Sequence, residues 1–79
     1  MGDTPLFAAL WAAQSGCCAI CNEPMPKHRG EVPHATIWKK RRATFDHIRP
    51  RSKGGGDEAG NLQLAHAACN WRKGDSWRG

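Results

Sequence analysis

Two pairs of cysteine and histidine residues, far apart in the sequence, constrain the fold of this chain more than any other feature. Cys18 and Cys21 form a Cys-x2-Cys pair, and His66 and Cys69 form a His-x2-Cys pair near the other end. Three thiolates and one imidazole suit zinc in a closed tetrahedral site. The i, i+3 spacing of the second pair would place both side chains on one face of a helix. We therefore predict a structural Zn2+ that ties the two ends of the chain together.

Other ligand sets are open. Cys17 could replace Cys18, although its spacing to the next cysteine is x3, and a Cys-x2-Cys turn is the commoner chelate. His28 or His34 could supply the imidazole instead of the histidine of the second pair. The cysteines could also be small buried hydrophobic residues without any metal.

A chain of 79 residues, 39% of them hydrophobic, needs such a staple. A domain of this size buries only about 60% of its unfolded surface, so a metal or disulfides usually supplement the core. The first residues lack the positive start of a secretory signal, and no segment approaches the roughly 20 apolar residues of a membrane span. We therefore expect no membrane association and a reducing, cytoplasmic setting in which cysteines bind metal.

Local patterns predict an α+β fold in a single domain over residues 1–79, without internal repeats. Thr4 and Pro5 are typical of a helix start and Gly16 of a helix stop, so a helix is expected within residues 1–15. Its apolar residues recur at helical spacing, which predicts packing rather than chemistry. The remaining core, residues 16–74, is expected to contain the zinc site.

Within that core, we expect a short strand near Ala35 to Trp38 and a second strand over residues 43–48. Residues 49–60 should form a loop, because three consecutive glycines disfavour regular structure. A short extended segment from Asn61 should then turn into a helix that ends at Gly74.

Basic residues are unevenly distributed. All twelve lysine and arginine residues lie at or after Lys27, so residues 27–79 carry a net charge of +7, with twelve cations against five carboxylates. Such a charge attracts a polyanion, although it also serves solubility.

Three further segments complete a pattern: DHIRPRSKGG from Asp46, NLQ from Asn61 and HAACNWRKG from His66. Together with the CAIC turn from Cys18, they resemble the motif and zinc knuckle of the HNH endonuclease family over about residues 16–74. The resemblance implies a small ββα-metal fold, in which two strands and a helix surround one catalytic metal ion. It also implies a DNA endonuclease, and so short a domain suggests a bacterial cell or a phage-infected host.

The resemblance assigns a role to each motif position. Asp46 would bind the catalytic ion, His47 would be the general base, and Asn61 would orient His47 or its loop. The third motif position, often histidine, is Asn70 here, which makes the chain an HNN variant. An amide oxygen is a competent ligand for Mg2+ or Mn2+, and other divalent transition metals are further candidates. His66 stands where the family usually has a cysteine, which zinc tolerates.

Phosphodiester hydrolysis asks for these residue types on chemical grounds as well. A water must lose a proton as it attacks, and histidine titrates near neutral pH. A divalent ion can stabilise the developing negative charge. The resemblance implies products with 5′-phosphate and 3′-hydroxyl ends. Cys69 and Asn70 are adjacent and diverge by about 100° on a helix, so one face can hold zinc and the next the catalytic ion.

Nine basic residues flank these motifs and are expected to contact DNA phosphates without reading bases. They are Lys39, Lys40, Arg41, Arg42, Arg49, Arg51, Lys53, Arg72 and Lys73. The first four could instead serve solubility, and the last two could complement the dipole of their helix.

Three tryptophans could stack on bases. We expect Trp38 and Trp71 to pack in the core, as tryptophan usually does in so small a domain. Trp77, in a glycine-flanked tail, is open.

Two other functions compete with the nuclease. A noncatalytic, zinc-stabilised nucleic-acid-binding module would need the cysteines and the charge but not the HNN residues. A degenerate nuclease with a structural role would show its decay at Asn70. Nicking and double-strand cutting both fit the motif, and the target and the oligomeric state are open.

Overall fold

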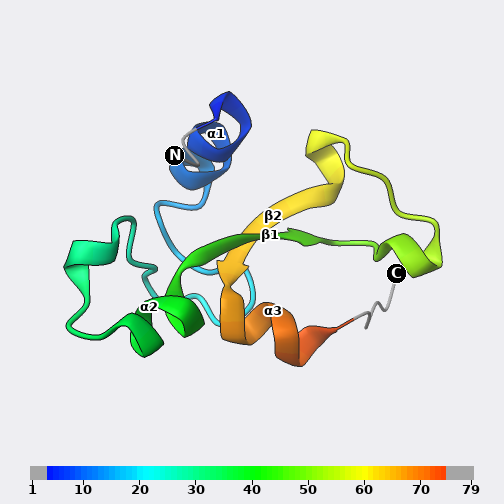
Figure 1. Cartoon of the computed structure of the whole chain (residues 1–79). Helices are drawn as coiled ribbons and strands as arrows, with labels where there is room; N and C mark the ends of the chain where they lie inside the picture. The colour runs from blue at the N-terminus through cyan, green and yellow to red at the C-terminus, as the bar shows by residue number, and fades with distance from the viewer. Residues whose placement is uncertain (1–3, 75–79) are drawn as a thin grey trace.

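The computed structural model describes residues 4–74. Its helices and strands follow in the order α1, α2, β1, β2 and α3, with bounds Pro5–Ala13, Ala35–Arg41, Ala43–His47, Leu62–His66 and Ala67–Lys73 (Figure 1). Short 3-10 turns occupy Arg29–Glu31, Arg51–Lys53 and Ala59–Asn61. The expected α+β class is confirmed, and β1, β2 and α3 supply the ββα unit.

The two strands pair antiparallel, and their register sets the distance between the functional residues. Ala43 pairs with His66 at one end of the sheet, and His47 pairs with Leu62 at the other end. At about 3.4 Å per residue, the two ends lie about 14 Å apart. Figure 1 shows the loop between the strands beyond the second end and α2 beside the first. The cysteines of the predicted zinc site are therefore separated along the sheet from His47 and Asn61, whereas Asn70 directly follows Cys69 on α3.

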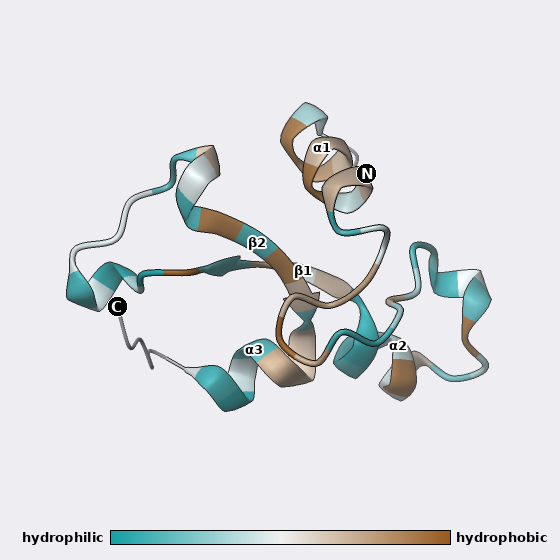
Figure 2. Cartoon of the chain, turned by 180° about the vertical axis from the view of Figure 1, so that it is seen from behind, coloured by the Kyte–Doolittle hydropathy of each residue, from teal (hydrophilic) through white to brown (hydrophobic). Residues whose placement is uncertain are grey.

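The first helix forms as its sequence predicts. Thr4 is its N-cap and accepts a hydrogen bond from the Phe7 backbone at 3.1 Å, and Pro5 opens the helix. The helix lies on one side of the sheet and α3 on the other (Figures 1 and 2). Its apolar side chains Phe7, Leu10 and Trp11 pack against the buried core. The expected packing role of this helix is thus confirmed.

The core is small and centres on β2. It consists of Cys18, Met25, Leu64, Ala65 and Cys69. Two of these five buried residues, Cys18 and Cys69, also belong to the predicted zinc site. Figure 2 shows hydrophobic residues on α1 and β2, whereas the C-terminal part of α3 and much of the β1–β2 loop are hydrophilic.

Gln14 joins α1 to the sheet. Its amide nitrogen donates to the Leu64 carbonyl at 2.9 Å, and its amide oxygen accepts from the Leu64 backbone nitrogen at 2.8 Å. The side chain thus hydrogen-bonds the open edge of β2 as a neighbouring strand would.

The strand expected near Ala35 to Trp38 is wrong, because this segment forms the helix α2. The β-branched and aromatic residues at 36–38 favour a strand locally, but the Lys and Arg residues that follow are strong helix formers and complement the dipole in the last turn. Ile37 and Trp38 are half-buried, and α2 packs against α3. This tertiary contact selects the helix.

The two tryptophans that were expected to pack in the core differ in their burial. Trp38 is partly buried as expected, but the packing expected for Trp71 is wrong, since 63% of this residue is exposed. Trp77 lies outside the described residues. No helix within residues 4–74 is long and apolar enough to cross a membrane.

Candidate metal cluster and active site

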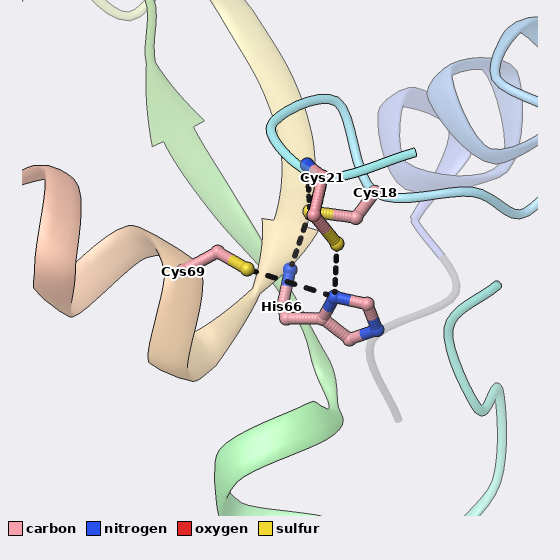
Figure 3. A group of neighbouring side chains, drawn as sticks. All are labelled: Cys18, Cys21, His66 and Cys69. Atoms are coloured by element: carbon pink, nitrogen blue, oxygen red, sulfur yellow. Dashed lines mark hydrogen bonds between the residues drawn. The ribbon is translucent and has the colours of Figure 1, made fainter. Parts of the chain in front are cut away.

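Four side chains converge where the turn after α1, at residues 18–21, meets the β2–α3 junction. The ligand atoms of Cys18, Cys21, His66 and Cys69 all lie within 4.8 Å of one another (Figure 3). Nδ1 of His66 lies 3.3 Å from Sγ of Cys21 and 3.8 Å from Sγ of Cys69. Its Nε2 lies 3.1 Å from the Pro24 carbonyl oxygen, to which it can donate. That hydrogen bond leaves Nδ1 as the ligand atom, the usual arrangement for a metal-binding histidine.

The protein environment prepares Cys18 for a cation. Burial opposes ionisation of this thiol, but backbone N–H groups of Cys21, His66 and Ile20 point at its sulfur from 3.4–3.5 Å and lower its pKa to about 6. By contrast, burial and the neighbouring Cys21 and Cys18 raise the pKa of Cys69 to about 11. A second thiolate is thus unfavourable here without a positive ion. A divalent cation removes that penalty, so the cluster could hold a metal such as zinc.

The alternative ligands lie elsewhere. Sγ of Cys17 lies 3.6 Å from the Ser15 carbonyl and takes no part in the cluster. His34 precedes α2, and His28 precedes the first 3-10 turn. His66 itself is the last residue of β2 and the N-cap of α3 rather than a residue within the helix. The expected helical i, i+3 pair is therefore a junction pair, although both side chains still reach one point.

A cleft of about 310 Å³ opens between the end of β1, the following loop and α3. It brings together three of the four expected catalytic residues, Asp46, His47 and Asn70. Its lining consists of Phe45, Asp46, His47, Pro50, Arg51, Ser52, Asn70 and Gly74.

Asp46 is a buried carboxylate with a partner on each oxygen. It is 2% exposed, and Gln63, its cross-strand neighbour, donates to Oδ2 at 2.7 Å. Lys73 donates to Oδ1 at 3.1 Å and to the His47 carbonyl at 2.9 Å. Burial of a charge demands such partners. Lys73 was expected to contact phosphate; its spacing of three from Asn70, on the same helix face, is the sequence signal for this second role.

The Asn70 amide is oriented by the strand beneath it. Its nitrogen donates to the Phe45 carbonyl at 3.0 Å and to the Thr44 hydroxyl at 3.2 Å. That hydroxyl gives its own proton to the Ala65 carbonyl at 3.0 Å, so it must accept from Asn70. The amide oxygen is therefore left as the ligand atom for a hard cation, the property that the resemblance implies for this position.

His47 contacts a carboxylate that the sequence analysis missed. Its Nε2 lies 2.7 Å from Oδ1 of Asp57, and Nη2 of Arg51 donates to both oxygens of the same carboxylate at 2.8 Å. The hydrogen bond from His47, followed by that from Arg51, holds the pKa of Asp57 below its usual value. The only sequence signal was a pair of acidic residues, Asp57 and Glu58, directly after the glycine run.

Asn61 acts on the loop rather than on the His47 ring. Its oxygen accepts from the Arg49 backbone nitrogen at 2.8 Å. Its nitrogen donates to the carbonyls of Arg49 at 3.1 Å and Gly56 at 2.8 Å. One side chain thus ties together both limbs of the loop that follows β1. Of the two roles considered for Asn61, the geometry favours orientation of the loop.

An HNH endonuclease family model matches residues 18–76, from the first cysteine of the cluster past the end of α3. The chain belongs to the HNH endonuclease family. Comparisons with curated proteins and with solved structures found no match. The family is one of nucleases, so this HNH protein has a nucleic-acid-related function.

Seven of the nine basic residues that were expected to contact DNA form two separate groups. Arg49, Arg51 and Lys53 lie on the loop beside the cleft, whereas the four basic residues at 39–42 lie on or directly after α2. All of these are exposed, as is Arg72 on α3, and only Lys73 is half-buried. The 39–42 group precedes the motif in sequence but lies one strand length from His47 in space.

Proposed function

We propose that this HNH protein is a metal-dependent DNA endonuclease that hydrolyses phosphodiester bonds. In this proposal His47 is the general base, and Asp46 and Asn70 hold one Mg2+ or Mn2+ ion. The observation that carries it is the cleft in which an imidazole, a carboxylate and an oriented amide meet beside Arg51. Membership of a nuclease family supports the same conclusion.

The residues of the cleft divide the reaction among them. His47 takes the proton of the attacking water as the water oxygen bonds to phosphorus and the bond from phosphorus to the 3′ oxygen breaks. Arg51, which grips a carboxylate in the free protein, suits a phosphate oxygen equally well. The bound divalent ion would stabilise the charge on phosphorus and the leaving oxygen. We propose products with 5′-phosphate and 3′-hydroxyl ends.

We propose that the cysteine cluster binds Zn2+ and that this ion has a structural role. Three thiol sulfurs and one imidazole nitrogen within 4.8 Å suit a closed tetrahedral site with no position left for substrate. All four cysteines are free thiols, which supports a reducing, cytoplasmic setting, as in a bacterial cell or a phage-infected host.

The proposed partner is the phosphate backbone of DNA. The exposed cations beside the cleft and on α2 support contacts at both ends of the sheet. The residues proposed for this role are Lys39, Lys40, Arg41, Arg42, Arg49, Arg51, Lys53, Arg72 and Lys73.

One observation favours a second candidate, a noncatalytic zinc-stabilised nucleic-acid-binding module. Gln63 and Lys73 already satisfy both oxygens of Asp46, so this carboxylate is stable without a divalent ion. The basic surface and the cysteine cluster would serve such a module equally well.

Incubation of zinc-loaded protein with supercoiled plasmid separates the two candidates. Mg2+ or Mn2+ is added or left out, because a strong chelator would also strip the cysteine cluster. We expect nicked or linear DNA only with the added ion, with ends that a polymerase can extend from a 3′-hydroxyl. Plasmid that is bound but uncut with either ion would favour the binding module.

A further inference from the structure

The loop after β1 is built to a fixed shape. The Ile48 backbone nitrogen donates to the Asn61 carbonyl at 2.9 Å, and the Gly55 nitrogen donates to the Pro50 carbonyl at 2.9 Å. A Cβ at Gly55 would lie 1.7 Å from the Arg49 carbonyl oxygen, so the two limbs of the loop touch where only glycine fits. Together with the three hydrogen bonds of the Asn61 side chain, these contacts fix the position of residue 57 in the loop.

Asp57 emerges beside the His47 ring. A hollow lined by Leu6, Phe45, His47, Arg51, Asp57 and Leu62 lies on this side of the ring. His47 also lines the cleft that contains Asp46 and Asn70. His47 therefore lines both the hollow that contains Asp57 and the proposed reaction site.

The chemistry of this contact fixes the ring tautomer. Asp57 is held as a carboxylate by Arg51, and an ionised carboxylate only accepts hydrogen bonds. Nε2 of His47, at 2.7 Å, must then carry the hydrogen. In a neutral imidazole this leaves Nδ1 as the only ring nitrogen able to accept a proton.

We infer that Asp57 is a positioning residue that holds His47 in the Nε2–H tautomer and directs Nδ1 to the reacting water. The catalytic consequence rests on the proposed nuclease function. The O–H bond of water breaks and its proton bonds to Nδ1, while the hydroxide oxygen bonds to phosphorus and the 3′ oxygen leaves. The imidazolium formed in this step lies beside the Asp57 carboxylate, which stabilises it, as a buried carboxylate does for the histidine of a Ser-His-Asp triad.

The same geometry allows an opposite role. Because the Asp57 carboxylate occupies Nη2 of Arg51, it could instead be a plug that a DNA phosphate displaces. The two roles predict opposite effects of removing Asp57. Removal of a plug would speed the reaction, whereas removal of a positioning residue would slow it.

The first test is the tautomer of His47 itself. Nitrogen-15 NMR of the zinc-loaded wild-type protein, without added divalent ion and above the histidine titration range, should show the Nε2–H form. Asp57→Ala should mix the two tautomers, whereas Glu58→Ala, an exposed neighbour, should leave the spectrum unchanged. A wild-type ring in the Nδ1–H form would overturn the inference even if the Asp57 variant failed to fold.

The second test is cleavage under single-turnover conditions at saturating DNA. Asp57→Ala should lower the rate constant at least about tenfold while DNA affinity changes less than about threefold. Because 65% of the Asp57 side chain is exposed, added formate should reach the gap and restore part of the rate, whereas chloride should not. A faster variant, or one with tighter DNA binding, would establish the plug.

His47→Ala, assayed in parallel, separates this inference from the proposed function. If that variant cuts like wild type, the nuclease assignment fails as well. If it is inactive while Asp57→Ala keeps both the wild-type rate and the tautomer, only the role of Asp57 is refuted.

Discussion

Lys73 places its ammonium nitrogen 3.1 Å from Oδ1 of Asp46, a carboxylate that is 2% exposed. The same nitrogen donates to the His47 carbonyl at 2.9 Å, which fixes its position. The protein therefore supplies its own cation on the carboxylate that we propose as a ligand of the catalytic ion. Two cations so close together repel each other strongly at low effective dielectric.

Lys73→Met should accordingly raise the affinity of the Asp46 site for Mn2+, by about tenfold. The variant removes a competing charge and leaves the buried carboxylate in need of a partner, and both changes favour the ion. Titration of zinc-loaded protein with Mn2+, followed by electron paramagnetic resonance, measures this directly. Lys53→Met, an exposed lysine on the loop, is the matched control. Unchanged or weaker Mn2+ binding in the Lys73 variant would show that Lys73 does not compete with the ion.

Cys21→Ser and Cys69→Ser should each lose bound zinc and most of the helical signal. The ion contributes its binding free energy to folding, and two of the cluster cysteines are also members of the small core. Elemental analysis and circular dichroism measure the two losses. Cys17→Ser should change neither, because this thiol lies outside the cluster. A wild-type protein that is folded but contains no zinc would contradict the proposed ion.

Gly55→Ala should disable the active-site loop without unfolding the core. The added Cβ would meet the Arg49 carbonyl oxygen at 1.7 Å, so the backbone that leads to Asp57 must shift. We expect single-turnover cleavage to fall by at least about tenfold at unchanged zinc content. Gly60→Ala is the matched control, since a Cβ there has nothing within 4 Å. Equal rates for the two variants would mean that the loop shape is unimportant for cleavage.

Replacing the four basic residues at 39–42 by alanine should weaken DNA binding and flatten its salt dependence. Each lost phosphate contact lowers the slope of log affinity against log salt by about 0.9. The rate at saturating DNA should change little, because α2 lies one strand length from His47. Binding isotherms at several salt concentrations give the slope. A slope equal to that of wild type would assign this group to solubility.

Local signals in the sequence account for most of the framework. The strand-like segment at 43–48 predicted β1, and Gly74 marked the end of α3. The ligand spacing predicted the cluster, since four metal-binding residues in two closely spaced pairs leave few ways to assemble a tetrahedral site. In contrast, α2 was misread as a strand because its local propensity is mixed and its packing against α3 decides the outcome.

The missed contacts depend on how distant parts of the chain return to β1, which local patterns alone do not fix. Asp57 reaches His47 only because Gly55 allows the loop to close on itself, and Lys73 reaches Asp46 only because α3 returns beside β1. Both involve residues far apart in sequence or across a turn. For Trp71 the burial prediction was wrong, because a short helix such as α3 buries only one face, and an apolar side chain on the other face stays exposed.

The most direct test of the account is the single-turnover rate of plasmid cleavage by His47→Ala in Mg2+. The matched control is His34→Ala, an exposed histidine that precedes α2 and makes no side-chain cap. We predict that His47→Ala is about 10²–10⁴-fold slower than wild type, with zinc content and DNA affinity preserved, while His34→Ala cuts normally. Cleavage by His47→Ala at the wild-type rate would contradict the proposed active site and leave the binding module as the better account.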